Sequence, residues 1–245
     1  MQEPFVKISV VVPVRNEEEN IPLLAREIGA ALTPLGHPWE CLWVNDASTD
    51  GSLFAIQSLC RDSPSHRLVD LDGPQGQSAA LAAGFAAARG ALLCTLDGDG
   101  QNDPADLPAL IGVLDRGEAD IAVGIRAYRR DNLIRKFSSR IGNGFRNRLT
   151  GVRVHDSGCS LRAFRPMCMR GIPVFKGMHR FIPTLIAMQG YRLAEQPVSH
   201  RPRTRGITKY GVWNRLWVGI GDTLAVCWMQ RRLVWPKVKP ARPHA

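Results

Sequence analysis

The sequence lacks the features that mark membrane-spanning, secreted and disulfide-linked proteins. It has no run of 18 or more apolar residues, so no transmembrane helix is expected. Residues 1–7 contain no basic region followed by an apolar stretch, which argues against a signal peptide. Its 6 cysteines include no CxxC pair, and Cys41 and Cys94 lie within apolar runs. This pattern is typical of reduced cysteines in a cytosolic protein and argues against a disulfide framework or a zinc site.

Internal repeats and a linker are also missing, so the 245 residues predict one main domain with a sizeable core. The content of 44% hydrophobic and 22% charged residues is ordinary for a soluble globular protein. We expect the domain to span residues 1–211 and an appendage to span residues 212–245.

Charge is distributed very unevenly along the chain. Residues 1–125 hold 7 Lys and Arg against 18 Asp and Glu, whereas residues 126–245 hold 25 against 4. The acidic half suits a cation, and the basic half suits a phosphate or an anionic membrane surface. Basic residues that only coat solvated helices are the alternative, which so large a surplus in one half disfavours.

Apolar, β-branched runs alternate with helical segments in the first half of the chain. Strands are predicted near 6–14, 39–44, 67–71, 91–96 and 120–125, and Asn16 is predicted to cap the first helix. This alternation predicts an α/β fold with a mostly parallel sheet. Ligands of such sheets bind beyond the carboxyl ends of the strands. Polar clusters stand at four of these ends, at residues 15–17, 45–46, 72 and 97–99.

The alternation breaks down after residue 126. We expect a basic helix over 133–149, strands over 158–164 and 191–198, and an apolar helix over 212–229. An apolar stripe at helical spacing runs along the last helix: Trp213, Leu216, Trp217, Ile220, Leu224, Cys227 and Trp228. A tryptophan-bearing amphipathic helix with basic flanks favours a membrane interface or a partner protein over docking on the protein's own core.

Asp97-Gly98-Asp99 is the strongest chemical motif of the sequence, because it directly follows a buried strand. Two carboxylates one residue apart can approach one divalent cation, and Gly98 permits the tight turn between them. Gln101 could add a carbonyl ligand. Oxygen ligands of this kind select Mg²⁺ or Mn²⁺, which would neutralise a diphosphate leaving group. An Asp-rich turn is the alternative reading, and the position at a strand end favours the metal.

Several stretches together resemble the family-2 glycosyltransferases of the GT-A fold, in the branch of the polyprenyl- and dolichyl-phosphate sugar synthases. They are VVVPVRNEEENIPLL, WVNDASTDGS, GQSAALAAGFAAARG, TLDGDGQNDP, DSGCSLRAF, HRFIP and RTRGITKYG. The order and spacing of these stretches fit the family over about residues 6–211. The family usually has Tyr where Arg15 stands, and Asp and Gly where Asn45 and Ala47 stand.

The resemblance implies roles for residues of the first half. The metal would bind Asp97, Asp99 and Gln101. The nucleotide sugar would lie against Pro13, Arg15, Asn16, Glu17, Asp46, Gln77, Asp97, Gly98 and Asp99.

The resemblance places the acceptor phosphate against Arg126, Ser139, Arg140, His179 and Arg180. Arginines can bind a phosphate with two hydrogen bonds, and an ionised phosphate needs no general base. Only three acidic residues lie between 126 and 200, which agrees with such an acceptor. Asp156 is the candidate base if the acceptor is instead a hydroxyl, and a turn residue otherwise. We therefore take Asp99, Arg126, Arg140 and Asp156 as the candidate catalytic residues.

The sequence thus predicts a metal-dependent, inverting glycosyltransferase that uses a UDP- or GDP-linked sugar and a polyprenyl phosphate. It would work in the cytoplasm on the inner membrane face, with a membrane protein as a possible partner. One alternative is an enzyme that glycosylates a sugar hydroxyl of a polysaccharide or glycolipid. A second is a basic membrane-binding module with an inactive site. No basic strand interleaved with aromatic residues supports nucleic-acid binding.

Overall fold

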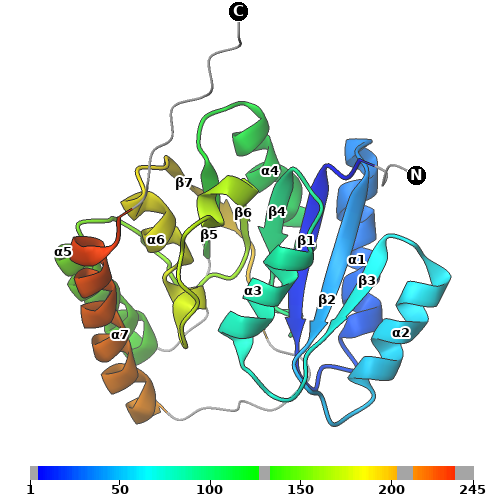
Figure 1. Ribbon diagram of the computed structural model, residues 1–245, viewed down its shortest axis with the longest axis horizontal. Helices are drawn as coiled ribbons and strands as arrows, with labels where there is room; N and C mark the ends of the chain where they lie inside the picture. The colour runs from blue at the N-terminus through cyan, green and yellow to red at the C-terminus, as the bar shows by residue number, and fades with distance from the viewer. Residues whose placement is uncertain (1–4, 127–132, 203–211, 235–245) are drawn as a thin grey trace, which may run out of the picture.

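A sheet of seven strands forms the centre of the described structure (Figure 1). The computed structural model describes residues 5–126, 133–202 and 212–234, and residues 133–141 and 212–218 by their backbone alone. The strands, in the order β3-β2-β1-β4-β6-β5-β7 across the sheet, are β1 (Ile8–Val14), β2 (Trp39–Asn45), β3 (His66–Asp70), β4 (Leu92–Thr95), β5 (Ile121–Arg126), β6 (Arg162–Phe164) and β7 (Leu193–Val198).

All neighbouring strands pair in parallel except at β6. β1 lies between β2 and β4, β5 pairs in parallel with β7, and β6 runs antiparallel between β4 and β5. The α/β fold with a mostly parallel sheet is therefore confirmed. The chain first builds outward from β1 to β3 and then returns to place β4 on the other side of β1. This reversal makes the carboxyl ends of β1 and β4 the usual ligand position of such a sheet.

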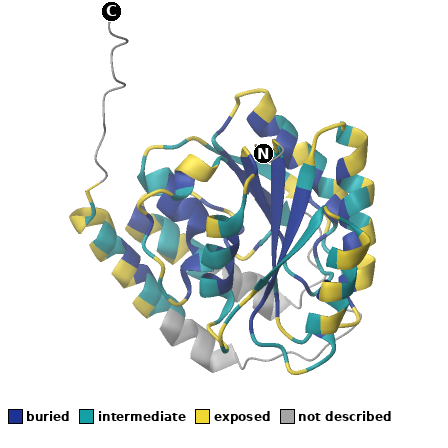
Figure 2. Ribbon diagram, turned by 45° about the vertical axis from the view of Figure 1, so that its right-hand side comes forward, coloured by how far each residue is buried: buried dark blue, intermediate teal, exposed yellow. Residues whose placement is uncertain are grey.

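Helices cover both faces of the sheet, so its central strands are buried on both sides and read as unbroken apolar runs (Figure 2). α1 (Ile21–Leu32), α2 (Ser52–Asp62) and α4 (Leu107–Asp115) pack on one face. α3 (Gln77–Ala87) and α6 (Ile182–Met188) pack on the other. Single 3-10 turns span Thr33–Leu35, Pro104–Asp106, Pro166–Met169 and Met178–Arg180.

The prediction that Asn16 caps the first helix was wrong. α1 begins at Ile21, and the residue at its N-cap is Asn20. Asn16 instead adopts the left-handed conformation, with φ 56°. Its side chain does not cap a helix but bonds to the loop after β2.

The predicted last helix is confirmed as α7 (Val212–Arg232), which lies beside α5 (Leu133–Thr150; Figure 1). Gln230 Nε2 donates a hydrogen bond to the Thr150 carbonyl at 3.0 Å, and Val226 is fully buried. Leu224 and Trp228 of the predicted stripe are 55% and 63% exposed. α7 thus docks on the protein through one side and presents apolar residues on another. Within the described residues, no helix is long and apolar enough to cross a membrane.

Candidate active site

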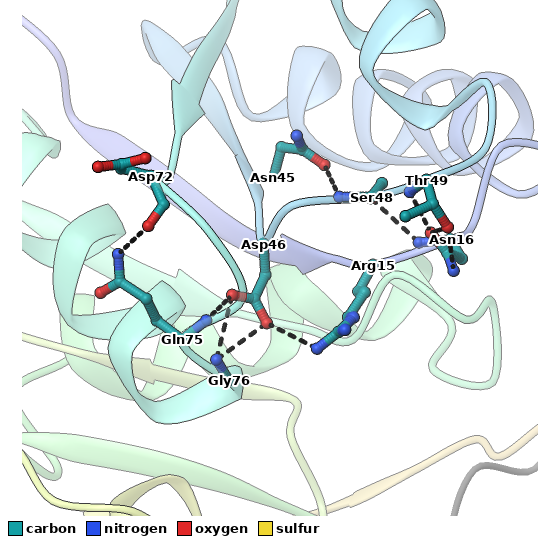
Figure 3. Close-up of polar contacts among 9 residues, drawn as sticks. All are labelled: Arg15, Asn16, Asn45, Asp46, Ser48, Thr49, Asp72, Gln75 and Gly76. Atoms are coloured by element: carbon teal, nitrogen blue, oxygen red, sulfur yellow. Dashed lines mark hydrogen bonds and ion pairs between the residues drawn. The ribbon is translucent and has the colours of Figure 1, made fainter.

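The loops that follow β1 and β2 are tied together at the carboxyl edge of the sheet (Figure 3). Asn16 N–H donates to Ser48 Oγ at 3.1 Å, and Thr49 N–H donates to Asn16 Oδ1 at 2.8 Å. Asn16 and Ala47 are the two non-glycine residues with positive φ in the described chain, at 56° and 50°. Strained backbone of this kind gathers where the surrounding structure fixes a binding site.

Asp46 connects the end of β2 to the loop before α3. Its carboxylate accepts hydrogen bonds from the backbone N–H of Gln75 at 2.6 Å and of Gly76 at 2.9 Å. Arg15 Nη1 lies 3.8 Å from Asp46 Oδ2 (Figure 3). Asp72, on the same loop, accepts a hydrogen bond from Gln75 Nε2 through its carbonyl at 3.4 Å. Asp46 therefore fixes the loop that leads into α3.

Glu17, also predicted at the nucleotide side, and Asn45, from the polar cluster that follows the second strand, bond to neighbouring loops and strands. The Glu17 N–H donates to Ser52 Oγ at 2.8 Å, and the Glu17 carboxylate accepts from Asn20 Nδ2 at 2.7 Å. Asn45 Nδ2 donates to Asp70 Oδ1 at 2.7 Å. These contacts hold the carboxyl ends of β1, β2 and β3 in one rigid group.

The Asp97-Gly98-Asp99 turn lies directly beside β1. A Cβ atom on Gly98 would stand 3.1 Å from the Pro13 carbonyl oxygen, a tight contact that a larger residue would make only with a shift of a few tenths of an ångström. Gln77 Nε2 donates to Asp97 Oδ1 at 2.7 Å, and the Gln101 N–H donates to Asp99 Oδ1 at 3.2 Å. The structure therefore brings Pro13, Gln77 and the two carboxylates together.

The electrostatics of this turn suit a bound cation. Burial, together with the nearby Asp99 carboxylate, raises the pKa of Asp97 from 3.8 to about 6. Among the described residues, no three His, Cys, Asp or Glu side chains surround one point. A divalent ion would therefore bind Asp97 and Asp99 and complete its shell with phosphate oxygens and water, as Mg²⁺ commonly does.

Arg126, at the end of β5, forms a closed ion pair with Asp156. Arg126 Nε donates to Asp156 Oδ2 at 2.7 Å, and Nη2 donates to Oδ1 at 2.8 Å. The side chains are 15% and 6% exposed, and the Arg126 N–H also donates to Oδ2 at 3.3 Å. Both Asp156 oxygens thus accept hydrogen bonds from an arginine that keeps its proton.

Arg162, on β6, is a buried charge that the sequence reasoning did not single out. It is 3% exposed, and its Nη1 and Nη2 donate to the carbonyls of His179 at 2.8 Å and Ser157 at 3.2 Å. Its charge lies near both Asp97 and Asp156, and it lowers the pKa of Asp97. An arginine within the apolar stretch LRAF was the signal that could have found it.

His179 and Arg180 lie on the turn at Met178–Arg180, against the helix α5. The Cζ atom of Arg146, on α5, lies over the Phe181 ring, 5.0 Å from the ring centroid. Burial lowers the pKa of Arg146, and the charge of Arg180 acts in the same direction. Ser139 and Arg140 lie on α5, but their side chains are outside the described residues. The structure therefore relates the turn that carries His179 and Arg180 to α5 through Arg146.

The segment after β7 also reaches the loop that follows the Asp97-Gly98-Asp99 turn, which the sequence did not reveal. Asn102 and His200 form an antiparallel bridge, and the Arg201 N–H donates to the Gln101 carbonyl at 2.9 Å. Arg201 also pairs with Glu27 at 2.8 Å. No local motif marks this pairing, because its partners are about 100 residues apart.

Comparison with known proteins gives consistent matches. The profile of glycosyl transferase family 2 matches residues 9–172. The dodecaprenyl-phosphate galacturonate synthase of Rhizobium johnstonii is 40% identical over 230 residues, covering 92% of this chain and 68% of that protein. The undecaprenyl-phosphate 4-deoxy-4-formamido-L-arabinose transferase of Salmonella paratyphi A is 38% identical over 208 residues, covering 84% and 63%. The chain therefore spans about two thirds of the length of these relatives.

Solved structures share the fold at low sequence identity. Glucosyl-3-phosphoglycerate synthase from Mycobacterium tuberculosis has a TM-score of 0.67 at 19% identity, covering 92% of this chain and 80% of that one. A mannosyltransferase from Pyrobaculum calidifontis, in complex with GDP-Man and Mn²⁺, has a TM-score of 0.64 at 21% identity, covering 94% and 66%. The mycobacterial enzyme has also been solved with UDP and Mn²⁺ or Mg²⁺. The likeness confirms the GT-A fold.

Proposed function

The chain belongs to glycosyl transferase family 2, and from this premise we propose that it transfers a sugar from a nucleotide diphosphate to a polyprenyl phosphate. The relatives at 40% and 38% identity are named for products or acceptors of this class. Their sugars differ, so the names support the acceptor class more strongly than any one donor.

The observation that carries the choice of acceptor is the closed pair of Arg126 and Asp156. A hydroxyl acceptor needs a base within hydrogen-bond reach of its proton. Asp156 is buried, and both its oxygens accept from Arg126. A phosphate acceptor is already ionised near pH 7 and needs cationic groups instead, which Arg126 and Arg180 would supply.

In the proposed reaction, Asp97 and Asp99 would hold a Mg²⁺ or Mn²⁺ ion, which stabilises the charge of the departing diphosphate. Gln77 orients the Asp97 carboxylate through its hydrogen bond. Arg126, held by Asp156, keeps a fixed direction and would place the attacking phosphate oxygen in line with the anomeric carbon. Attack from the face opposite the diphosphate inverts the configuration of that carbon.

We also propose that the C-terminal part, residues 212–245, meets the inner face of the membrane and keeps the protein peripheral. Support comes from Leu224 and Trp228, which are more than half exposed on α7, and from the basic surplus of this part. Apolar residues beside basic ones bind an anionic lipid surface through both burial and charge.

The test is sugar transfer with Mn²⁺, a short polyprenyl phosphate and a panel of UDP- and GDP-sugars that includes UDP-galacturonate. We expect product with the wild type, loss of product with Asp99→Ala and Arg126→Ala, and normal activity with the control Arg192→Ala. Arg192 pairs with Asp120 at the opposite end of β5 and is exposed. Donor hydrolysis without lipid product would overturn the acceptor and return attention to a hydroxyl.

A further inference from the structure

The first residues of α3 and the loop before it contact three parts of the site at once. Gln75 and Gly76 donate to Asp46 on the nucleotide side, and Gln77 donates to Asp97 at the metal turn. The next residue, Ser78, bonds to the turn that carries His179 and Arg180. Four consecutive residues therefore connect the donor side to the acceptor side.

Ser78 is buried, and its hydroxyl has three partners on that turn. The backbone N–H groups of Gly177 and His179 lie 3.1 and 3.4 Å from Ser78 Oγ, and His179 Nδ1 lies 3.0 Å from it. A hydroxyl offers two lone pairs and one hydrogen. The two N–H groups occupy the lone pairs, so the hydroxyl hydrogen points to His179 Nδ1.

This arrangement determines which ring nitrogen of His179 carries the hydrogen. Because Nδ1 accepts from Ser78, a neutral ring must carry its own hydrogen on Nε2. Burial, together with the charges of Arg180 and Arg162, lowers the pKa of His179 to about 3. The ring is therefore uncharged near pH 7 and offers Nε2–H as a hydrogen-bond donor.

The turn itself is fixed from two other sides. Arg162 Nη1 donates to the His179 carbonyl at 2.8 Å. Gly177 has φ 94°, and a Cβ atom there would stand 2.5 Å from Asp222 Oδ2 of α7. His179 thus has little freedom to swing, and its ring direction depends on the bond to Ser78.

We propose that Ser78 is a positioning residue that fixes the Nε2–H tautomer of His179, so that His179 donates a hydrogen bond to the phosphate monoester of the acceptor. The proposal rests on the proposed function for the identity of that acceptor. It explains why an uncharged donor stands beside Arg162 and Arg180. A further full positive charge there would be repelled, whereas a neutral N–H still binds a phosphate oxygen.

The first measurement is the tautomer, which does not depend on turnover. Long-range ¹H–¹⁵N correlations at pH 7 report both ring nitrogens, and the His179 signals are identified by their absence in His179→Gln. We expect a neutral ring with its hydrogen on Nε2 in the wild type and a mixture of tautomers in Ser78→Ala. Inorganic phosphate and a short polyprenyl phosphate are then added separately, and each is expected to shift Nε2 more than Nδ1. A ring that carries its hydrogen on Nδ1, or is protonated at both nitrogens, overturns the proposal whatever the enzyme transfers.

The second measurement separates acceptor binding from general stability. Ser78→Ala is expected to raise KM for the polyprenyl phosphate about tenfold, the value of one well-placed hydrogen bond, and to leave KM for the nucleotide sugar unchanged. Ser78→Thr keeps the hydroxyl and should restore acceptor affinity, and Ser58→Ala on α2 is the control.

His179→Gln places an amide near the position of Nε2 and should bind the acceptor better than His179→Asn. Equal rises in both KM values, or a lower melting temperature alone, would make Ser78 a structural residue. Failure of the wild type to form lipid product, with the Nε2–H tautomer and the phosphate shift present, would contradict the proposed function alone.

Discussion

Replacing Asp156 with asparagine tests what the carboxylate beside Arg126 does. The wild-type side chain accepts from Arg126 Nε, Nη2 and N–H. The amide keeps one oxygen acceptor, loses the charge, and turns an NH₂ group toward a guanidinium. Breaking a buried pair costs about 3–5 kcal/mol, and the remaining acceptor and the partial exposure of Arg126 reduce this to about 2–3 kcal/mol. For a chain of this size, that loss lowers the melting temperature by roughly 4–12 °C.

The expected kinetic result follows from the same contacts. An unfixed Arg126 should raise KM for the polyprenyl phosphate about tenfold, and kcat at saturating acceptor should stay within about tenfold. Loss of a general base would instead lower kcat by about 10²- to 10⁴-fold. The assay is lipid-product formation against acceptor concentration, together with thermal unfolding. Asp120→Asn, in the exposed pair at the other end of β5, is the control and should cost about 1 kcal/mol or less. A thousandfold fall in kcat with unchanged KM and melting temperature would refute the holding role and make Asp156 the base.

Three further predictions concern the metal turn, the strained loop and α7. Because the pKa of Asp97 is raised to about 6, the metal-free folded state holds this proton more tightly than the unfolded chain. Its stabilising contribution is therefore present below about pH 4 and is lost as the pH rises through about 6. A cation competes with that proton, so Mn²⁺ affinity by calorimetry should be about tenfold weaker at pH 5 than at pH 7, and an equal affinity would contradict the metal role. Ala47→Gly should relieve the left-handed backbone at φ 50° and stabilise the fold by about 1 kcal/mol, seen as a melting temperature roughly 2–4 °C higher; a decrease would mean that this loop is not strained. Leu224→Ser with Trp228→Ser should weaken binding to anionic vesicles at unchanged melting temperature, since both side chains are exposed, and unchanged vesicle binding would exclude this face.

Much of the fold could be predicted from the sequence because apolar runs report burial directly. β1, β2 and β4 lie where the runs near 6–14, 39–44 and 91–96 placed them. The antiparallel direction of β6 could not be predicted in this way. Its three residues pair with β4 and β5, which precede it by at least 36 residues, and neither composition nor periodicity encodes that pairing.

Site residues could be predicted where they directly follow a strand in the sequence. Contacts between residues far apart in the sequence were harder to predict. The turn at Asp97 was found because two carboxylates there stand out against an apolar strand. The bond from Gln77 to Asp97, by contrast, is created by the packing of α3 on the sheet. Asn16 shows a further limit, because a side chain typical of helix caps was used to tie two loops together.

The antiparallel strand β6 has a consequence for how the protein is made. β4 and β5 leave the ribosome before residue 162, and neither can complete its pairing until β6 arrives to lie between them. In the meantime the inner edge of β4 exposes backbone groups ready to pair with any extended chain. During synthesis the sheet therefore passes through a stage in which β4 and β5 each have an unpaired edge. The three-residue strand β6 later fills the gap between them.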